Sequence, residues 1–190
     1  KCMLINIELA RYMAACSAST GRQIGILADR KGNIDYVIVG DAKVLVIPEL
    51  TDYPLGRKVL RGLRLIHTHL NNEAISKDDI TDLSLLRLDA LVAIGLKDDG
   101  EPDKVYLANL APTDSAAYTI EEPVQFQRID SAFDDLNEMV LSIEEELKSR
   151  SSGFDVKDSR EKAILVSVST GSRYEQEDSM EELKELAISS

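Results

Sequence analysis

Leu63-Arg64-Leu65-Ile66-His67-Thr68-His69 is an apolar run that ends in the only two histidines of the chain. A run of this kind predicts a buried strand. Residues two apart in a strand point to the same side, so we expect both imidazoles to face one spot. Asp79 follows shortly after and adds a carboxylate, and Ser76 precedes it. Two imidazoles and a carboxylate are a ligand set for zinc, so the sequence predicts a candidate metal site of His67, His69 and Asp79.

The segment that follows predicts a helix from Ser76 to about Arg87. Ser76 and Asp79 also have the spacing of a helix capping box, in which both side chains satisfy backbone N–H groups at the start of a helix. This structural role is an alternative to metal binding, and in it the histidines are hydrogen-bonded residues at a strand end. Two further strands are predicted at residues 91–96 and 105–110, separated by a turn at 97–103.

The segment before the histidines predicts a helix and then an antiparallel meander. Apolar spacing favours an amphipathic helix that Gly21 ends. Short apolar runs separated by turn residues then indicate strands. The fold class is therefore α/β in the broad sense, an α+β arrangement whose mixed, mainly antiparallel sheet is flanked by helices. The expected elements are a helix at 7–18, strands at 24–26 and 36–39 with a hairpin turn at 29–33, and a third strand at 44–47 that Pro48 closes.

The C-terminal part predicts a long helix and a truncated strand-helix unit. Residues 113–128 are polar and irregular, and apolar residues then recur at steps of four and three from Ile129 to Leu147, as in a helix that packs on a neighbour. A strand at 163–168 and a helix around 180–186 follow. The predicted division is an N-terminal helix at 1–20, a domain at 21–148, a linker at 149–159 and the truncated unit at 160–190.

The composition bounds the class of protein. The chain has 190 residues, 44% of them hydrophobic, and a net charge of −12. Residues 1–112 carry 14 basic and 15 acidic residues, whereas residues 113–190 carry 8 and 19, so the acidic part would repel nucleic acid. No apolar run has the length of a membrane span, and the N-terminus lacks the features of a secretion signal, so we expect a cytoplasmic protein with no membrane partner.

One other feature is a candidate binding site. A cluster of basic residues lies within eight positions without an acid, which favours either a phosphate contact or a solvated loop. A phosphate-binding loop is absent, because no segment matches the glycine and lysine spacing that binds nucleotide phosphates. The basic cluster consists of Arg57, Lys58, Arg61 and Arg64.

The order His-x-His followed by Ser-x-x-Asp resembles the signature of JAB/MPN metalloproteases and the related RadC proteins. The resemblance covers roughly residues 20–112 and implies that His67, His69 and Asp79 hold zinc while Ser76 assists the hydrolysis of a peptide or isopeptide bond. Those families have proline after the second histidine and seven residues before the serine, whereas here Leu70 follows and the spacing is six. Their catalytic glutamate lies three residues before a glycine, and the matching position is Arg22. We therefore expect less than one zinc ion per chain and no hydrolysis.

Four longer runs resemble the extra N-terminal region of some bacterial HflX-type GTPases: residues 21–33, 36–42, 60–70 and 78–89. Residues 160–166 and 179–187 resemble the start of the ordinary HflX N-terminal domain. The resemblance implies a parent protein that hydrolyses GTP with magnesium in a G-domain and associates with the large ribosomal subunit.

From these resemblances we expect an accessory, catalytically silent, JAB-like binding or regulatory domain with no cofactor other than the candidate zinc. The alternative is an active zinc-dependent peptidase or isopeptidase. A plain interaction module that uses the helix at 129–147 is compatible with the first reading. Residues 161–190 carry apolar faces, and we expect them to form a homodimer through an exposed strand edge.

Overall fold

The computed structural model describes residues 5–56, 58–111, 117–152, 180–181 and 183–184. The chain divides into two units, residues 1–153 and 154–190. In the second unit, Met180, Glu181, Leu183 and Lys184 are helical, within the predicted helix. The predicted strand at 163–168 lies outside the described residues, and so does the segment assigned to dimerisation, apart from these four positions.

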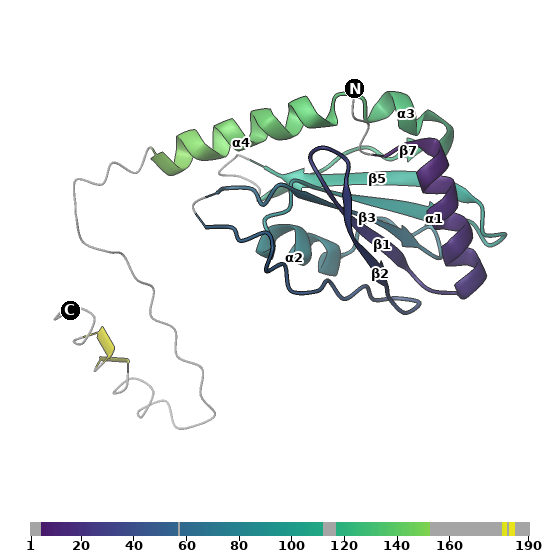
Figure 1. The fold of residues 1–190 in the computed structure, drawn as a ribbon, viewed down its shortest axis with the longest axis horizontal. Coiled ribbons are helices and arrows are strands. Elements are labelled where there is room, and N and C mark those ends of the chain that lie inside the picture. Colours follow the sequence, from purple (N-terminus) through teal and green to yellow (C-terminus); the bar gives the residue numbers. More distant parts are fainter. Residues whose placement is uncertain (1–4, 57, 112–116, 153–179, 182, 185–190) are drawn as a thin grey trace. The chain divides into compact units, whose positions relative to one another are not determined.

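The first unit is built on one sheet with helices on both faces, as the predicted α+β class requires (Figure 1). The strand order is β2-β1-β3-β4-β5-β6, and β7 also pairs with β5. All pairs are antiparallel except β3 with β4, which are parallel and are connected through α2. The strands are β1 (Ile24–Asp29), β2 (Ile34–Val39), β3 (Leu63–His69), β4 (Ala90–Leu96), β5 (Pro102–Leu110), β6 (Tyr118–Ile120) and β7 (Val124–Gln125).

Side-chain alternation assigns the helices to opposite faces of the sheet. The Thr68 hydroxyl donates to Ser17 of helix α1 (Ile7–Thr20), and Arg64 donates to Asn137 of helix α4 (Leu136–Ser152). Even-numbered side chains of β3 therefore face α1 and α4, and odd-numbered ones face the opposite side, where α2 (Lys77–Leu85) lies. The short helices η1 (Phe126–Arg128) and α3 (Ile129–Ala132) lead into α4.

Gly21 ends helix α1 as predicted, in the left-handed conformation with a φ of 65°. At the start of the helix, the Asn6 side chain accepts a hydrogen bond from the Leu9 N–H, a cap that was not predicted. Asp29 accepts hydrogen bonds from the backbone N–H groups of Lys31 and Asn33, which closes the predicted hairpin turn between β1 and β2.

The predicted third strand at 44–47 is wrong, because the segment pairs with no described strand. The prediction of irregular structure at 113–128 is also wrong in part, because the described residues include β6, β7 and η1. The predicted single helix at 129–147 is interrupted at Phe133–Asp135, and α4 then continues to Ser152, so the first residues of the predicted linker are helical.

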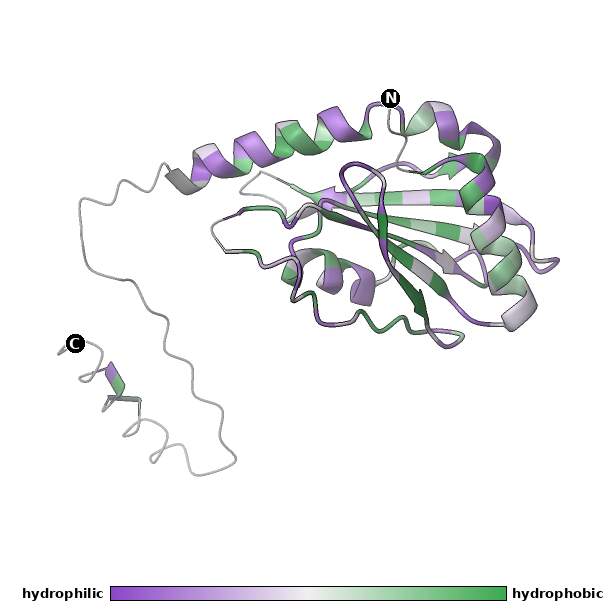
Figure 2. Ribbon diagram, in the orientation of Figure 1, coloured by the Kyte–Doolittle hydropathy of each residue, from purple (hydrophilic) through white to green (hydrophobic). Residues whose placement is uncertain are grey.

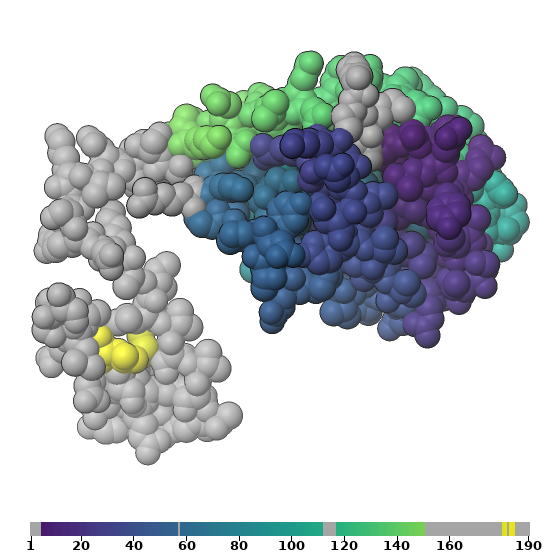
Figure 3. Space-filling view, in the orientation of Figure 1, coloured from purple at the N-terminus to yellow at the C-terminus, as the bar shows by residue number. Residues whose placement is uncertain are grey.

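The hydrophobic core lies between the sheet and the helices. Strands β3 and β4 are buried along their whole length, and the hydropathy colouring shows the apolar residues concentrated along the central strands (Figure 2). In the space-filling view, the N-terminal part of the chain, coloured purple to blue, covers much of the face shown (Figure 3). No helix among the described residues has the length and apolar character of a membrane span.

Candidate metal centre

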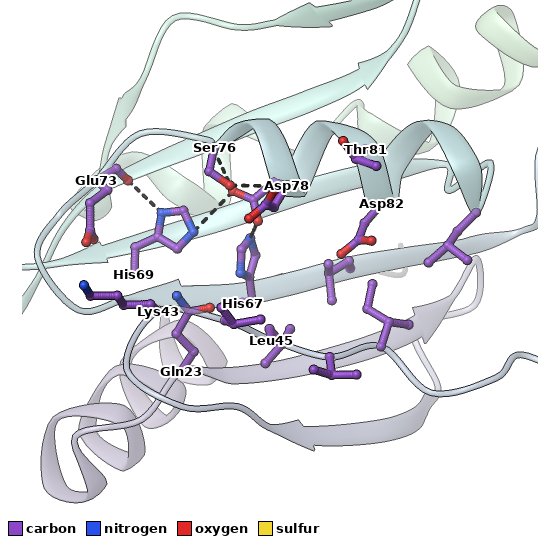
Figure 4. Close-up of a pocket in the computed structure, with 16 residues that line it drawn as sticks. Gln23, Lys43, Leu45, His67, His69, Glu73, Ser76, Asp78, Thr81 and Asp82 are labelled. Atoms are coloured by element: carbon purple, nitrogen blue, oxygen red, sulfur yellow. Dashed lines mark hydrogen bonds and ion pairs between the residues drawn. The ribbon is translucent and has the colours of Figure 1, made fainter. Parts of the chain in front are cut away.

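The candidate site lies where β3 ends and α2 begins, and three ligand-type side chains meet there (Figure 4). The Nε2 atom of His67 lies 3.5 Å from Oδ1 of Asp79, and Nε2 of His69 lies 3.4 Å from Oδ2 of the same carboxylate. One potential ligand atom from each residue lies within 4.8 Å of the others. The structure therefore brings together His67, His69 and Asp79, as the period-two spacing and the helix start predict.

The orientation of His69 is fixed by the backbone. Its Nδ1 lies 2.9 Å from the backbone carbonyl oxygen of Glu73. A carbonyl oxygen can only accept a hydrogen bond, so Nδ1 carries the proton and donates it. In a neutral ring, Nε2 then presents a lone pair to the Asp79 carboxylate, and two acceptors facing each other repel unless a proton or a metal cation lies between them. Burial lowers the pKa of His69, but hydrogen bonds with Asp79 and the Glu73 carbonyl outweigh this effect and raise the pKa above its usual value.

His67 is more deeply enclosed, and neither ring nitrogen makes a hydrogen bond in the described part of the chain. Its relative exposure is 1%, and its ring meets the His69 ring edge to face at a centroid distance of 4.7 Å. Burial lowers the pKa of His67 to about 4, although the Asp79 charge opposes the shift. His67 is therefore neutral at pH 7, which is the protonation state that a metal ligand needs.

Ser76 and Asp79 do form the predicted capping box. The Ser76 N–H donates to Oδ2 of Asp79 at 2.7 Å, and the Asp79 N–H donates to the Ser76 hydroxyl at 3.1 Å. Burial acts to raise the pKa of Asp79, but the hydrogen bond from His69 and the charge and hydrogen bonds around it lower the pKa to about 2. The cap leaves Oδ1 directed at His67, so the structural role and a metal-binding role are compatible.

The donor set suits zinc. Two imidazole nitrogens and a carboxylate oxygen are typical zinc ligands, and one ligand atom from each residue lies within 4.8 Å of the others. The two nitrogen-oxygen distances of 3.5 and 3.4 Å are longer than ordinary hydrogen bonds, and each involves a different oxygen of Asp79. The backbone carbonyl behind His69 is also a common second partner of zinc-binding histidines.

Gln23, and not Arg22, faces the site. Gly25 pairs with His67 in the antiparallel register, and Gln23 lies two residues before Gly25, which by side-chain alternation puts it on the same side of the sheet as His67. Gln23 lines the pocket, and its amide points toward the two imidazoles (Figure 4). The Arg22 guanidinium instead donates to the Gly40 carbonyl at 2.9 Å. Arg22 therefore does not line the pocket, contrary to the expectation that its charge lies beside the site.

The site opens into a groove of about 620 Å³ between α2 and residues 43–47. The side chain of Leu45 lies over Gly25. A Cβ added to Gly25 would lie 2.5 Å from Cδ2 of Leu45. The groove therefore has an apolar part beside the histidines. Its lining residues outside the site include Gln23, Lys43, Val44, Leu45, Val46, Ile47, Leu65, Glu73, Asp78, Asp82 and Leu86.

The residues of the basic cluster do not form a continuous exposed patch, because two of them make contacts inside the protein. Arg61 donates to the carbonyls of Leu86 and Tyr53, both at 2.6 Å. Arg64 is 1% exposed and contacts Asn137, whereas Arg57 lies outside the described residues. Two of the four residues thus hold the structure together.

No protein-family model matches this chain, and no curated protein matches it. One solved structure with some similarity is the solution structure of a protein from Salinibacter ruber. It is 17% identical, the match covers 62% of this chain and 85% of the other, and the TM-score is 0.33. A likeness at this level carries no argument about fold or function.

Proposed function

We propose that residues 1–153 form a JAB/MPN-like module that binds zinc and does not hydrolyse its ligand. One observation supports this most: two imidazoles and the Asp79 carboxylate converge so that one ligand atom from each lies within 4.8 Å of the others, while Gln23 lines the pocket beside them. His67, His69 and Asp79 would hold the ion. Zinc would supply Lewis-acid polarisation of a ligand oxygen.

The proposal of a silent site is supported by the amide of Gln23 beside the histidines and by the hydrogen bonds that already engage the groove carboxylate of Glu73. The Gln23 amide takes up no proton near neutral pH. Glu73 lines the groove, but its carboxylate accepts from the Asn71 N–H and the Asn71 side chain at 3.0 and 2.8 Å. Asp82 lies about one helical turn beyond Asp79, about 4.5 Å further along α2. These side chains therefore support binding and orientation better than proton transfer.

Zinc binding is tested by metal analysis of protein dialysed against zinc and then against buffer. Because the Arg22 guanidinium binds the Gly40 carbonyl and does not line the pocket, we expect a single zinc ion per chain, in place of the lower content expected from the sequence. The ion should be lost on His69→Ala and retained on Asp98→Asn, which alters an exposed turn residue. Asp79→Asn should weaken binding while retaining part of the helix cap. Equal zinc content in the wild type and His69→Ala would refute the assignment.

We further propose that this module is an accessory part of a bacterial HflX-type GTPase. The support is the resemblance of residues 21–33, 36–42, 60–70 and 78–89, and the GTP and magnesium site would belong to a G-domain of that parent. The test is co-sedimentation of the full parent protein with large ribosomal subunits, with and without residues 1–153. The proposal fails if the parent binds neither GTP nor the subunit.

The alternative, a zinc-dependent peptidase or isopeptidase, is favoured by the same three ligands and by Ser76 beside them. Incubation of the zinc-loaded chain with peptide and isopeptide substrates separates the two functions. We expect no cleavage by the wild type. Turnover that disappears on His69→Ala would replace the silent module with the hydrolase.

A further inference from the structure

The orientation of His69 depends on the loop that follows β3. Residues 70–76 connect β3 to α2, and the backbone carbonyl of Glu73 within this loop lies 2.9 Å from His69 Nδ1 (Figure 4). Glu73 is exposed, and its carboxylate accepts hydrogen bonds from the neighbouring Asn71. These two bonds lie within the loop and do not attach it to the sheet. The position of the carbonyl therefore depends on the contacts that fix the loop to the sheet.

Asn72 attaches this loop to the sheet. Its Nδ2 donates to Oδ2 of Asp103 on β5 at 2.7 Å, and its carbonyl oxygen accepts from the Tyr106 hydroxyl at 3.4 Å. Because β4 lies between β3 and β5, the Asn72 side chain must cross β4 to reach Asp103. It crosses at Gly95, where an added Cβ would lie 3.0 Å from the Asn72 Cα and closer still to its Oδ1. Gly95 is also the residue of β4 that pairs with His69, so the attachment lies beside the histidine.

The conformation of Asn72 has two costs. Its φ of 57° lies in the left-handed region, which disfavours residues other than glycine, although asparagine tolerates it better than most. Its Oδ1 is buried and makes no hydrogen bond within the described part of the chain, so it loses the hydrogen bonds that it would make with water. A glycine at this position would avoid both costs but would lack the amide that binds Asp103. Costs of this kind persist where the surrounding structure imposes them, and they are common at functional sites.

We propose that Asn72 is a positioning residue of the candidate metal centre. Attached to β5 across β4, it holds the Glu73 carbonyl against His69 Nδ1. The carbonyl keeps the proton on Nδ1, so Nε2 retains the lone pair that a metal ion needs. The inference rests on the proposed zinc site for its purpose, but the tautomer of His69 is a property of the metal-free chain and is measured without zinc.

Variants that exchange a donor and an acceptor test this role. Asn72→Asp replaces the donor by a second carboxylate facing Asp103, so the two carboxylates repel and the loop should detach from β5. Asp103→Asn keeps an oxygen that can accept from Asn72 and should change little. In the double variant Asn72→Asp, Asp103→Asn, the new amide can donate to the new carboxylate, so the attachment should return. Gly95→Ala is an independent variant, because its Cβ would displace Asn72.

Zinc affinity of the full chain, measured by competition with a chelator, is the first readout. Loss of an outer partner of a ligating histidine costs roughly 10- to 100-fold in metal affinity, and we expect Asn72→Asp to weaken zinc binding about tenfold. The added negative charge by itself would raise the affinity for a dication, so a fall in affinity cannot come from the charge. Asp103→Asn should bind zinc nearly as the wild type does, and the double variant should recover most of the loss.

The tautomer of His69 in the metal-free chain is the second readout. The chain has only two histidines, so comparison with His69→Ala assigns their ring nitrogen NMR signals. At a pH where the His69 ring is neutral, the wild type should carry the proton on Nδ1. Asn72→Asp should shift it toward Nε2, and the double variant should restore it. Arg30→Met, which removes ion pairs with Asp89 and Glu144, controls for a general loss of stability and should leave the tautomer unchanged.

The two readouts separate the positioning role from the zinc site. An unchanged tautomer in Asn72→Asp would overturn the positioning role, whatever the zinc affinity of this variant, and zinc bound by the wild type would still support the site. A shift in Asn72→Asp that the double variant does not reverse would overturn the attachment to Asp103 as its cause. If the wild type binds no zinc but its tautomer responds as expected, the positioning of His69 stands and the zinc proposal fails.

Discussion

Arg30 connects the sheet to α4, and its removal should destabilise the protein strongly. Its Nε and Nη2 donate to Asp89 at 2.5 and 3.1 Å, and its Nη1 donates to Glu144 of α4 at 2.8 Å. The Asp89 side chain is 0% exposed. Arg30→Met retains the aliphatic stem but leaves this buried carboxylate with the Gly62 N–H as its remaining hydrogen-bond donor among the described residues.

The expected loss follows from these burial values. Removing one partner of a buried ion pair costs roughly 3–5 kcal/mol, and we place this case at about 3 kcal/mol because the Gly62 hydrogen bond remains. The Glu144 side chain is 11% exposed and also pairs with Lys148, so its share is smaller, about 1 kcal/mol or less. Arg30→Met should therefore lower the free energy of unfolding by about 3–4 kcal/mol.

Urea unfolding followed by circular dichroism measures this loss. The double variant Arg30→Met, Asp89→Asn should be more stable than the sum of its single variants predicts, because the uncompensated charge is removed with its partner. Lys148→Met, which removes an exposed lysine, should change stability by less than about 0.5 kcal/mol. A loss below about 1 kcal/mol for Arg30→Met, or simple additivity with Asp89→Asn, would refute the reasoning.

Three further predictions concern the groove. Gln23→Glu should raise zinc affinity about tenfold by adding a negative charge beside the site, whereas Arg22→Glu should change the affinity by less than about threefold. Competition with a chromophoric chelator measures both affinities. A larger effect of Arg22→Glu than of Gln23→Glu would contradict the placement of Gln23. Zinc affinity should fall as the pH is lowered, because a proton competes with zinc for His69. Burial opposes the rise, but the pKa of His69 is raised in the metal-free protein. A zinc affinity that stays constant between about pH 8 and pH 5 would exclude His69 as a ligand. Gly25→Ala should cost about 1 kcal/mol by displacing Leu45, and Leu45→Ala in the same chain should recover part of the loss in thermal unfolding, which a steric cause requires.

The elements around the candidate site could be predicted because their signals are local. The alternation of β3 placed His67 and His69 on one side, and the Ser76 and Asp79 spacing marked the start of α2. Neither feature depends on distant parts of the chain. The meeting of the three side chains then follows from the short connection between strand and helix.

The errors arose where pairing or register decides the outcome. Residues 44–47 have the composition of a strand, but a strand also needs a partner, and sequence alone names none. The short strands β6 and β7 form in a polar segment because β5 offers them an edge. The apolar spacing from 129 to 147 indicates which side chains face the core. Two helices separated by Phe133–Asp135 give this spacing as well as one long helix does.

The position of Gln23 required the register of the sheet. Counting residues back from Gly25 led to Arg22, but side chains alternate along a strand, and only those an even number of positions from Gly25 share its side. The pairing of Gly25 with His67 settles which side that is. Parity along the strand was the signal that could have identified Gln23.

The parallel pairing of β3 with β4 has a consequence for how this site changes over evolutionary time. The three potential ligands lie at the end of β3 and at the start of α2 in the crossover that follows, so one short stretch of gene, from His67 to Asp79, encodes the whole set. A single inserted codon between Ser76 and Asp79 would turn the carboxylate about 100° around the helix axis and away from the imidazoles. One local mutation is therefore enough to remove the ligand set. Transfer of the same short stretch of gene would be enough to introduce it into another protein with the same crossover.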